Sequence, residues 1–352
     1  MTSEKQIFKD TSREEWMRRI EKDLKGKSLD TMDLLIDGIH FPRFVHASDQ
    51  KNDPEPLGLS KTENTWNITS RIAVTDVVDA NKVALAELEG GVNAIRFELK
   101  EFDKKKMPLL LDQIIPENIS IHWSLSNKVN IEDFSGWWTH WSRDLPATSH
   151  SVSLDYERSY FDPISETLTI VGTENCALPD KSTAELENVI LALITELIDI
   201  SHEIIKSDDF QVRLIIPSGA SILWEISKLR ALRILAAHVA LAFDLPEDRF
   251  LIETTAGQTI TSMSPNDHKI ATPVLALACV TGDADDICLP IPEDIEPGKE
   301  LFHRRIARNV HHLLISESKM GKVIDPAAGS YFFEELTNRI AATCWESVQE
   351  KC

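Results

Sequence analysis

Small hydroxyl side chains alternate with large apolar side chains along three short segments, residues 120–126, 149–154 and 167–173. A period of two is typical of β-strands whose two faces meet different surroundings. Hydroxyl groups placed side by side would bind a thin, polar ligand. A second interpretation remains open, in which strand hydroxyls reflect β-propensity and bond only to nearby backbone. The hydroxyl positions taken as candidate substrate-binding residues are Ser124, Ser126, Ser151, Ser153 and Thr169.

A histidine pair and a lysine run suggest a metal site and a phosphate site, but neither assignment is favoured. His311 and His312 are adjacent, and adjacent residues of a helix point about 100° apart, so the two rings do not chelate one metal ion together. The run Lys104–Lys106 suits a phosphate, yet such runs are usually solvated helix starts. No metal site is expected.

Three tryptophans, Trp137, Trp138 and Trp141, fall within one expected helix. Tryptophan buries a large area, so this cluster belongs either to the core or to a subunit interface. The sequence leaves both interpretations open.

The overall composition limits the classes of function. The net charge is −20 and the isoelectric point about 5.0, whereas nucleic-acid binders need a basic surface. Five cysteines without Cys-x-x-Cys spacing favour a reducing compartment over disulfides or zinc. The first residues resemble no signal or transit peptide, and no apolar run is long enough to cross a bilayer. We therefore expect a cytoplasmic protein without a membrane or nucleic-acid partner.

The elements that would position these residues alternate along the chain. Residues 1–65 predict an N-terminal helix and an extended arm, which we take as a subunit-contact segment. Residues 66–352 alternate eight candidate strands with seven helices, beginning with a strand at 71–78 and a helix at 81–91. Strict alternation of this kind predicts a parallel sheet, and eight units close a (β/α)8 TIM-type barrel. One linker, residues 158–166, is too short for a covering helix.

In such a barrel the apolar strand faces pack on the helices, which leaves the hydroxyl positions lining the interior. A polar lumen of that kind would admit a long, thin ligand. Bulky side chains entering from other strands would close it, and a register shift of one residue would turn the hydroxyls outward.

Several segments resemble the methylmalonyl-CoA mutase family. The stretch "RIARN" at 305–309 and "VIDPAAGSYFFEELT" at 323–337 are similar to that family's last barrel units. "EEWMRRIEKDLKGKSL" near the amino terminus and "ISKLRALRIL" at 226–235 are similar to its first segment and its sixth barrel helix. The resemblance extends over nearly the whole chain and is strongest with the small, β-type subunit.

The resemblance implies a barrel that threads an acyl-CoA and is closed by a separate cobalamin-binding domain. The family's cobalt-ligating Asp-x-His-x-x-Gly motif does not occur among these residues. We therefore expect adenosylcobalamin in the assembled enzyme but none on this chain alone, and we expect the chain to be cut before a cobalamin-type domain.

The resemblance also places three catalytic positions. Thr173 and Glu174 stand where the family has a Tyr-His pair, and Ala256 stands where it has a further histidine. Gln258, two residues on, is a candidate substrate-binding residue. These replacements imply a non-catalytic small subunit that supports a homologous large subunit in a heterodimer, within an isomerase that interconverts methylmalonyl-CoA and succinyl-CoA.

Two alternatives stay open. The chain is an active acyl-CoA mutase barrel that uses a separately encoded cobalamin subunit, in which Glu174 makes a polar contact to substrate. Otherwise it is a module that binds a CoA ester without turnover.

Overall fold

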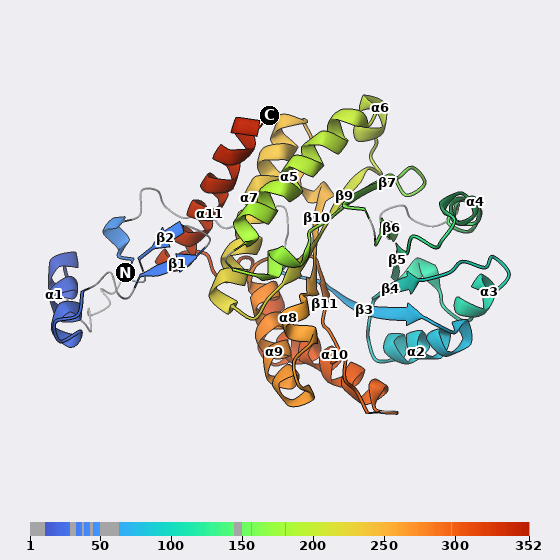
Figure 1. Cartoon of the computed structure of the whole chain (residues 1–352), viewed down its shortest axis with the longest axis horizontal. Helices are drawn as coiled ribbons and strands as arrows, with labels where there is room; N and C mark the ends of the chain where they lie inside the picture. The colour runs from blue at the N-terminus through green and yellow to red at the C-terminus, as the bar shows by residue number, and fades with distance from the viewer. Residues whose placement is uncertain are drawn as a thin grey trace, which may run out of the picture.

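A computed structural model describes residues 11–28, 33–36, 39–42, 45–49, 63–143, 150–155, 157–179, 181–296 and 298–351. Nine strands form one sheet in the spatial order β6-β5-β4-β3-β11-β10-β9-β8-β7, and eight of them run parallel (Figure 1). The sheet curls until β6 lies beside β7 and β8, so the barrel is nearly closed at this seam. The expected (β/α)8 TIM-type barrel is confirmed.

The parallel strands are β3 (Asn67–Val74), β4 (Ala94–Leu99), β5 (Ser120–Leu125), β6 (His150–Leu154), β8 (Thr167–Val171), β9 (Gln211–Ser218), β10 (Phe250–Ala256) and β11 (Asp286–Cys288). The helices around them are α2 (Val77–Glu89), α3 (Met107–Leu110), α4 (Ile131–Trp141), α5 (Ser182–Asp199), α6 (His202–Ile205), α7 (Ile222–Ala242), α8 (Gln258–Thr261), α9 (Pro265–Thr281), α10 (Glu300–Ser316) and α11 (Tyr331–Lys351). Five 3₁₀ turns complete the described elements: η2 (Ala47–Asp49), η3 (Pro116–Asn118), η5 (Glu174–Ala177), η6 (Glu247–Arg249) and η7 (Met320–Lys322).

The expected strand at 71–78 was placed too late in the chain. The strand ends at Val74, and α2 begins at Val77 because the Asp76 carboxylate accepts hydrogen bonds from the backbone N–H groups of Val78 and Asp79. An N-cap of this kind starts a helix where apolar periodicity alone would continue a strand.

The short linker after β6 contains no helix among its described residues. Instead β7 (Ser159–Asp162) pairs antiparallel with β8. Asp162 at its end is buried and accepts a hydrogen bond of 2.9 Å from Trp138 Nε1 on α4. The expected absence of a covering helix at this point of the ring is confirmed.

Two apolar clusters lie between the strands and the helices. One combines β3–β6 with α2 and α4, and the other combines β8–β10 with α5, α7, α9 and α11. Trp137 and Trp138 are buried in the first cluster, where both contact Trp123 of β5 edge to face. Trp137 and Trp138 therefore belong to the core, and Trp141 is partly buried and packs against it.

The described elements of the amino-terminal part are α1 (Arg13–Asp23) and the hairpin of β1 (Leu34–Ile36) and β2 (Ile39–Phe41). The hairpin lies beside α11, away from the seam (Figure 1). Ser12 and Glu15 form a capping box at the start of α1. The ring of Phe41 packs edge to face on Phe332 of α11, which fixes the hairpin to the barrel.

Candidate functional site

Charged side chains cross the interior of the barrel. Arg96 on β4 donates to both carboxylate oxygens of Glu253 on β10, a strand that is not its neighbour in the sheet. Arg213 on β9 bonds to Glu253 at 3.3 Å and to Asp286 of β11 at 2.7 Å. These four side chains, which we call the interior ion network, are each at most 4% exposed. They fill the middle of the lumen.

None of these four residues was expected at the site. Arg96 and Arg213 stand within largely apolar strands, "AIRFEL" and "QVRLII", while Glu253 follows the apolar start of "FLIETTA" and Asp286 begins β11. A charge in such a position signals an inward-facing side chain, because the outer face must pack on helices. That signal was present in the sequence, but it does not identify the partner across the barrel.

Burial in the barrel interior shifts the pKa values of two groups, Asp286 of the network and His122 beside it. Burial raises the pKa of Asp286 against the opposing charge of Arg213. Burial, together with the charges of Arg213 and Arg96, lowers the pKa of His122 well below its usual value. His122 is therefore neutral near pH 7 and adds no charge to the interior.

Three of the candidate hydroxyl residues lie beside the network. The Ser151 hydroxyl lies 2.9 Å from Nδ1 of His122. Ser153 accepts a hydrogen bond from Arg96 and donates one to the carbonyl of Trp123, both at 3.2 Å. Thr169 is fully buried, and its hydroxyl has no hydrogen-bond partner among the described residues. All three belong to the polar interior, but they lie in a closed layer.

The other candidates lie at the carboxyl ends of the strands or outside the barrel. Ser124 donates to Asp155, and Ser126 donates to the carbonyl of Lys100 at 2.9 Å. Gln258 begins α8 on the surface. The structure therefore does not bring the six candidate residues together into one continuous channel.

The mouth at the carboxyl ends of the strands is polar. Arg71 of β3 is ion-paired with Glu98 of β4, and their side chains are 56% and 21% exposed. Ser124 lies on β5, the next strand along the ring, and Asp155 directly follows β6. Active sites of such barrels lie at this end, so the mouth is where a ligand from solvent would first meet the protein.

Thr173, Glu174 and Ala256 lie where two loops of the barrel meet. The Thr173 hydroxyl accepts a hydrogen bond from the N–H of Asn175 at 3.3 Å. The Glu174 carboxylate accepts one from the backbone N–H of Gln258 at 2.6 Å, directly after Ala256 ends β10. Glu174 thus ties the segment after β8 to the segment after β10, so Thr173, Glu174 and Ala256 lie at the same end of the barrel.

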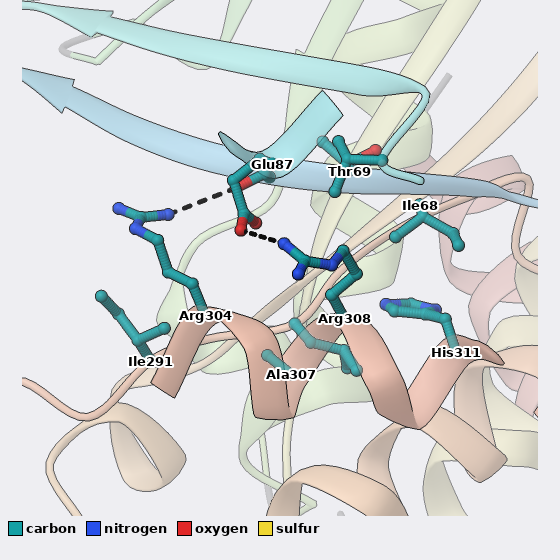
Figure 2. A pocket seen from close by; sticks show the side chains of 11 residues that line it. Ile68, Thr69, Glu87, Ile291, Arg304, Ala307, Arg308 and His311 are labelled. Atoms are coloured by element: carbon teal, nitrogen blue, oxygen red, sulfur yellow. Dashed lines mark hydrogen bonds and ion pairs between the residues drawn. The ribbon is translucent and has the colours of Figure 1, made fainter. Parts of the chain in front are cut away.

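A small cavity lies outside the barrel, between β3, α2 and α10 (Figure 2). Arg304 and Arg308 reach it from the same face of α10: Arg304 donates to Ser70 at 3.2 Å, and Arg308 pairs with Glu87 of α2 at 2.6 Å. Water centres can occupy about 20 Å³ of it, which is room for one water molecule. Because it is so small, we do not assign it a substrate.

The segments that carry the family resemblance join elements of the fold. Arg308 belongs to "RIARN" and locks α10 to α2. Arg230 of "ISKLRALRIL" is ion-paired with Asp325 and with Glu334, both in the segment at 323–337. The pairs are buried and hold the turn before α11 against α7, so their part is structural.

Groups of His, Cys, Asp and Glu that could hold a metal ion do not occur in the described parts of the chain. His311 is buried and accepts a hydrogen bond of 3.0 Å from Trp66 Nε1, while His312 Nε2 lies 2.9 Å from the carbonyl of Gly90. Likewise, no helix of the described residues is long and apolar enough to cross a membrane.

Comparison with known proteins agrees with the resemblance. Residues 192–351 match the sequence profile of the family described as methylmalonyl-CoA mutase. The methylmalonyl-CoA mutase small subunit of Streptomyces virginiae is 37% identical over 128 residues, which cover 36% of this chain and 21% of that protein. The small subunit of Porphyromonas gingivalis is 26% identical over a match covering 96% of this chain and 62% of that protein. A solved Yersinia pestis DHPS superposes on 80% of this chain, and on 100% of its own, with a TM-score of 0.39 and 12% identity.

Proposed function

We propose that this chain, whose residues 192–351 match the methylmalonyl-CoA mutase family, is the barrel part of a small, non-catalytic subunit. The assembled enzyme would be a coenzyme B12-dependent isomerase that interconverts methylmalonyl-CoA and succinyl-CoA. The matched regions span only part of the curated relatives, so the activity of the whole protein is part of this proposal.

The interior ion network is the observation that carries the proposal. A threaded acyl-CoA needs an open path along the barrel axis, and here the pair of Arg96 on β4 and Glu253 on β10 crosses the interior, with Arg213 of β9 bonded beside it. Opening that path would separate buried charges from their partners, which costs several kcal/mol for each ion. A barrel closed in this way supports a partner rather than turning over substrate itself.

The contacts of Thr173 and Glu174 at the mouth of the barrel support the same conclusion. Glu174 is engaged by the backbone of Gln258, and Thr173 caps its own 3₁₀ turn. Ala256 has no group that transfers a proton or polarises a carbonyl. The residues at these three positions therefore hold loops together and leave the chemistry to another chain.

We place both acyl-CoA and adenosylcobalamin on a homologous large subunit. The described residues do not fit a cobalt ligand at the barrel mouth, because the histidines of the barrel strands, His122 and His150, are at most 3% exposed. The proposed partner contact includes the amino-terminal segment, residues 1–65, whose described hairpin stands beside α11 (Figure 1).

Co-expression with the catalytic large chain of the same organism tests the proposal. Light scattering should give a one-to-one complex, and the kcat of the loaded complex should stay unchanged when this chain carries Thr173→Ala. A loss of turnover in that complex, with the complex itself intact, would instead favour an active mutase barrel.

A further inference from the structure

Three inward-facing side chains of the barrel each leave one buried polar atom unbonded among the described residues. The atoms are His122 Nε2, Thr169 Oγ1 and Arg213 Nε. The residues are at most 3% exposed, so bulk solvent does not reach them. Buried polar atoms in native proteins nearly always have a partner, and an orphan atom points to an ordered water or ion.

Strand pairing and the closeness of β6 to β8 place the three side chains near one another, and the charge of Arg213 is near enough to help lower the pKa of His122. Thr169 and Arg213 are direct partners on β8 and β9, and adjacent strands lie about 4.8 Å apart. His122 is the register partner of Ser151 on β6, and β6 lies beside β8 at the seam. The orphan atoms therefore face the same part of the interior from both sides of the seam.

We propose that one buried water molecule occupies the barrel interior between Thr169, Arg213 and His122. The Arg213 Nε–H group donates to the water, and the Thr169 hydroxyl donates to it or accepts from it. His122 supplies the third contact through Nε2, because its Nδ1 is already engaged by Ser151. Three partners are the usual number for a buried water.

The charges around the proposed site favour a water molecule over a small anion as its occupant. The two guanidinium groups of Arg96 and Arg213 already face the two carboxyl groups of Glu253 and Asp286. An additional anion would be buried beside Glu253 without a compensating cation, which is unfavourable in a dry interior. A neutral water satisfies the same atoms without that penalty.

The proposal is tested by whether the Thr169→Val variant raises or lowers the midpoint of thermal unfolding. Thr169→Val removes the hydroxyl and keeps the shape. If the hydroxyl binds water, the variant should lower the midpoint of thermal unfolding by about 2–4 °C. If the hydroxyl is a true orphan, the variant should raise the midpoint, which would overturn the proposal. Thr167→Val on the same strand is the matched control: its hydroxyl donates to Ser165 O at 3.1 Å, so it should lower the midpoint in either case.

A crystal structure of the chain tests the ligand directly and does not depend on the variants. A single peak within hydrogen-bond distance of Arg213 Nε and Thr169 Oγ1, with no anomalous signal after a bromide soak, would support a water. An anomalous bromide peak there would overturn the assignment in favour of an anion, and so would featureless density.

Discussion

At the scale of single residues, the barrel depends on charges that have no access to solvent. Glu253 accepts from Arg96 and from Arg213, so removal of its charge leaves two buried cations with only Asp286 between them. Pairs of this kind are weak evidence for net stabilisation over an apolar core, but breaking one is strongly unfavourable.

Glu253→Gln should therefore lower the free energy of unfolding by about 3–5 kcal/mol, measured by urea denaturation. Asp23→Asn is the matched control, because the side chains of its ion pair with Arg19 are 61% and 70% exposed. The control should change stability by no more than about 0.5 kcal/mol. Equal effects of the two variants would show that the interior network does not bear on folding.

The sequence indicated which strand faces are polar, but not which residues meet. The alternation of polar and apolar residues along 120–126 and 167–173 is a local pattern with a period of two, and such a pattern can be recognised in the sequence. The contact between Arg96 and Glu253 depends on how far the strands are staggered around the ring, which no single segment encodes. That is why the hydroxyl residues were named and the ion network was missed.

At the scale of elements, two helices are locked where glycine permits close approach. A Cβ built on Gly90 would lie 2.0 Å from Cζ of Arg308, the residue that pairs with Glu87. An alanine at this position must displace the guanidinium group and weaken that pair.

Gly90→Ala should lower the free energy of unfolding by about 1–3 kcal/mol. The same change should have much less effect in an Arg308→Ala background, because the clashing group is then gone, and urea titrations of the double-mutant cycle measure this coupling. Gly136→Ala is the control: Gly136 lies inside α4, its Cβ would meet nothing within 4 Å, and alanine there should stabilise by about 0.5–1 kcal/mol. Additive effects of Gly90→Ala and Arg308→Ala would contradict the proposed contact.

The ends of elements were predicted less well than their types. The predicted bounds of the strand before α2 were too late in the chain, because the start of α2 depends on side-chain hydrogen bonds of the Asp76 cap, which hydrophobic periodicity does not show. The missing helix after β6, in contrast, followed from chain length alone, since residues 158–166 are too few to cross back over the sheet. The length of a linker therefore limits the topology more firmly than hydrophobic periodicity fixes where a helix or strand begins and ends.

At the scale of the whole molecule, buried histidines make stability depend on pH. Burial lowers the pKa of His150 and His268 to about 4 and that of His311 to about 3. The usual value is 6.5, so the unfolded chain binds more protons than the folded chain between pH 6.5 and about 4. Stability is therefore highest above pH 6.5 and falls as the pH falls through this window.

His311→Gln should reduce that loss by about one proton, or about 1.4 kcal/mol for each pH unit below 6.5. Glutamine keeps an acceptor for Trp66, so the variant separates titration from the loss of a hydrogen bond. Urea titrations from pH 7.5 to 4.5 measure both slopes. Parallel profiles of the variant and the wild-type chain would show that His311 does not titrate on unfolding.

We propose that the interior ion network closes the barrel, so that this chain does not bind the acyl-CoA named in the family name of its relatives. Isothermal titration of the chain with methylmalonyl-CoA, up to millimolar ligand, tests this most directly. The structure predicts no saturable binding. Saturable one-to-one binding that is weakened by Ser153→Ala, which lies beside Arg96 in the lumen, would contradict the claim and establish an open, ligand-bearing barrel.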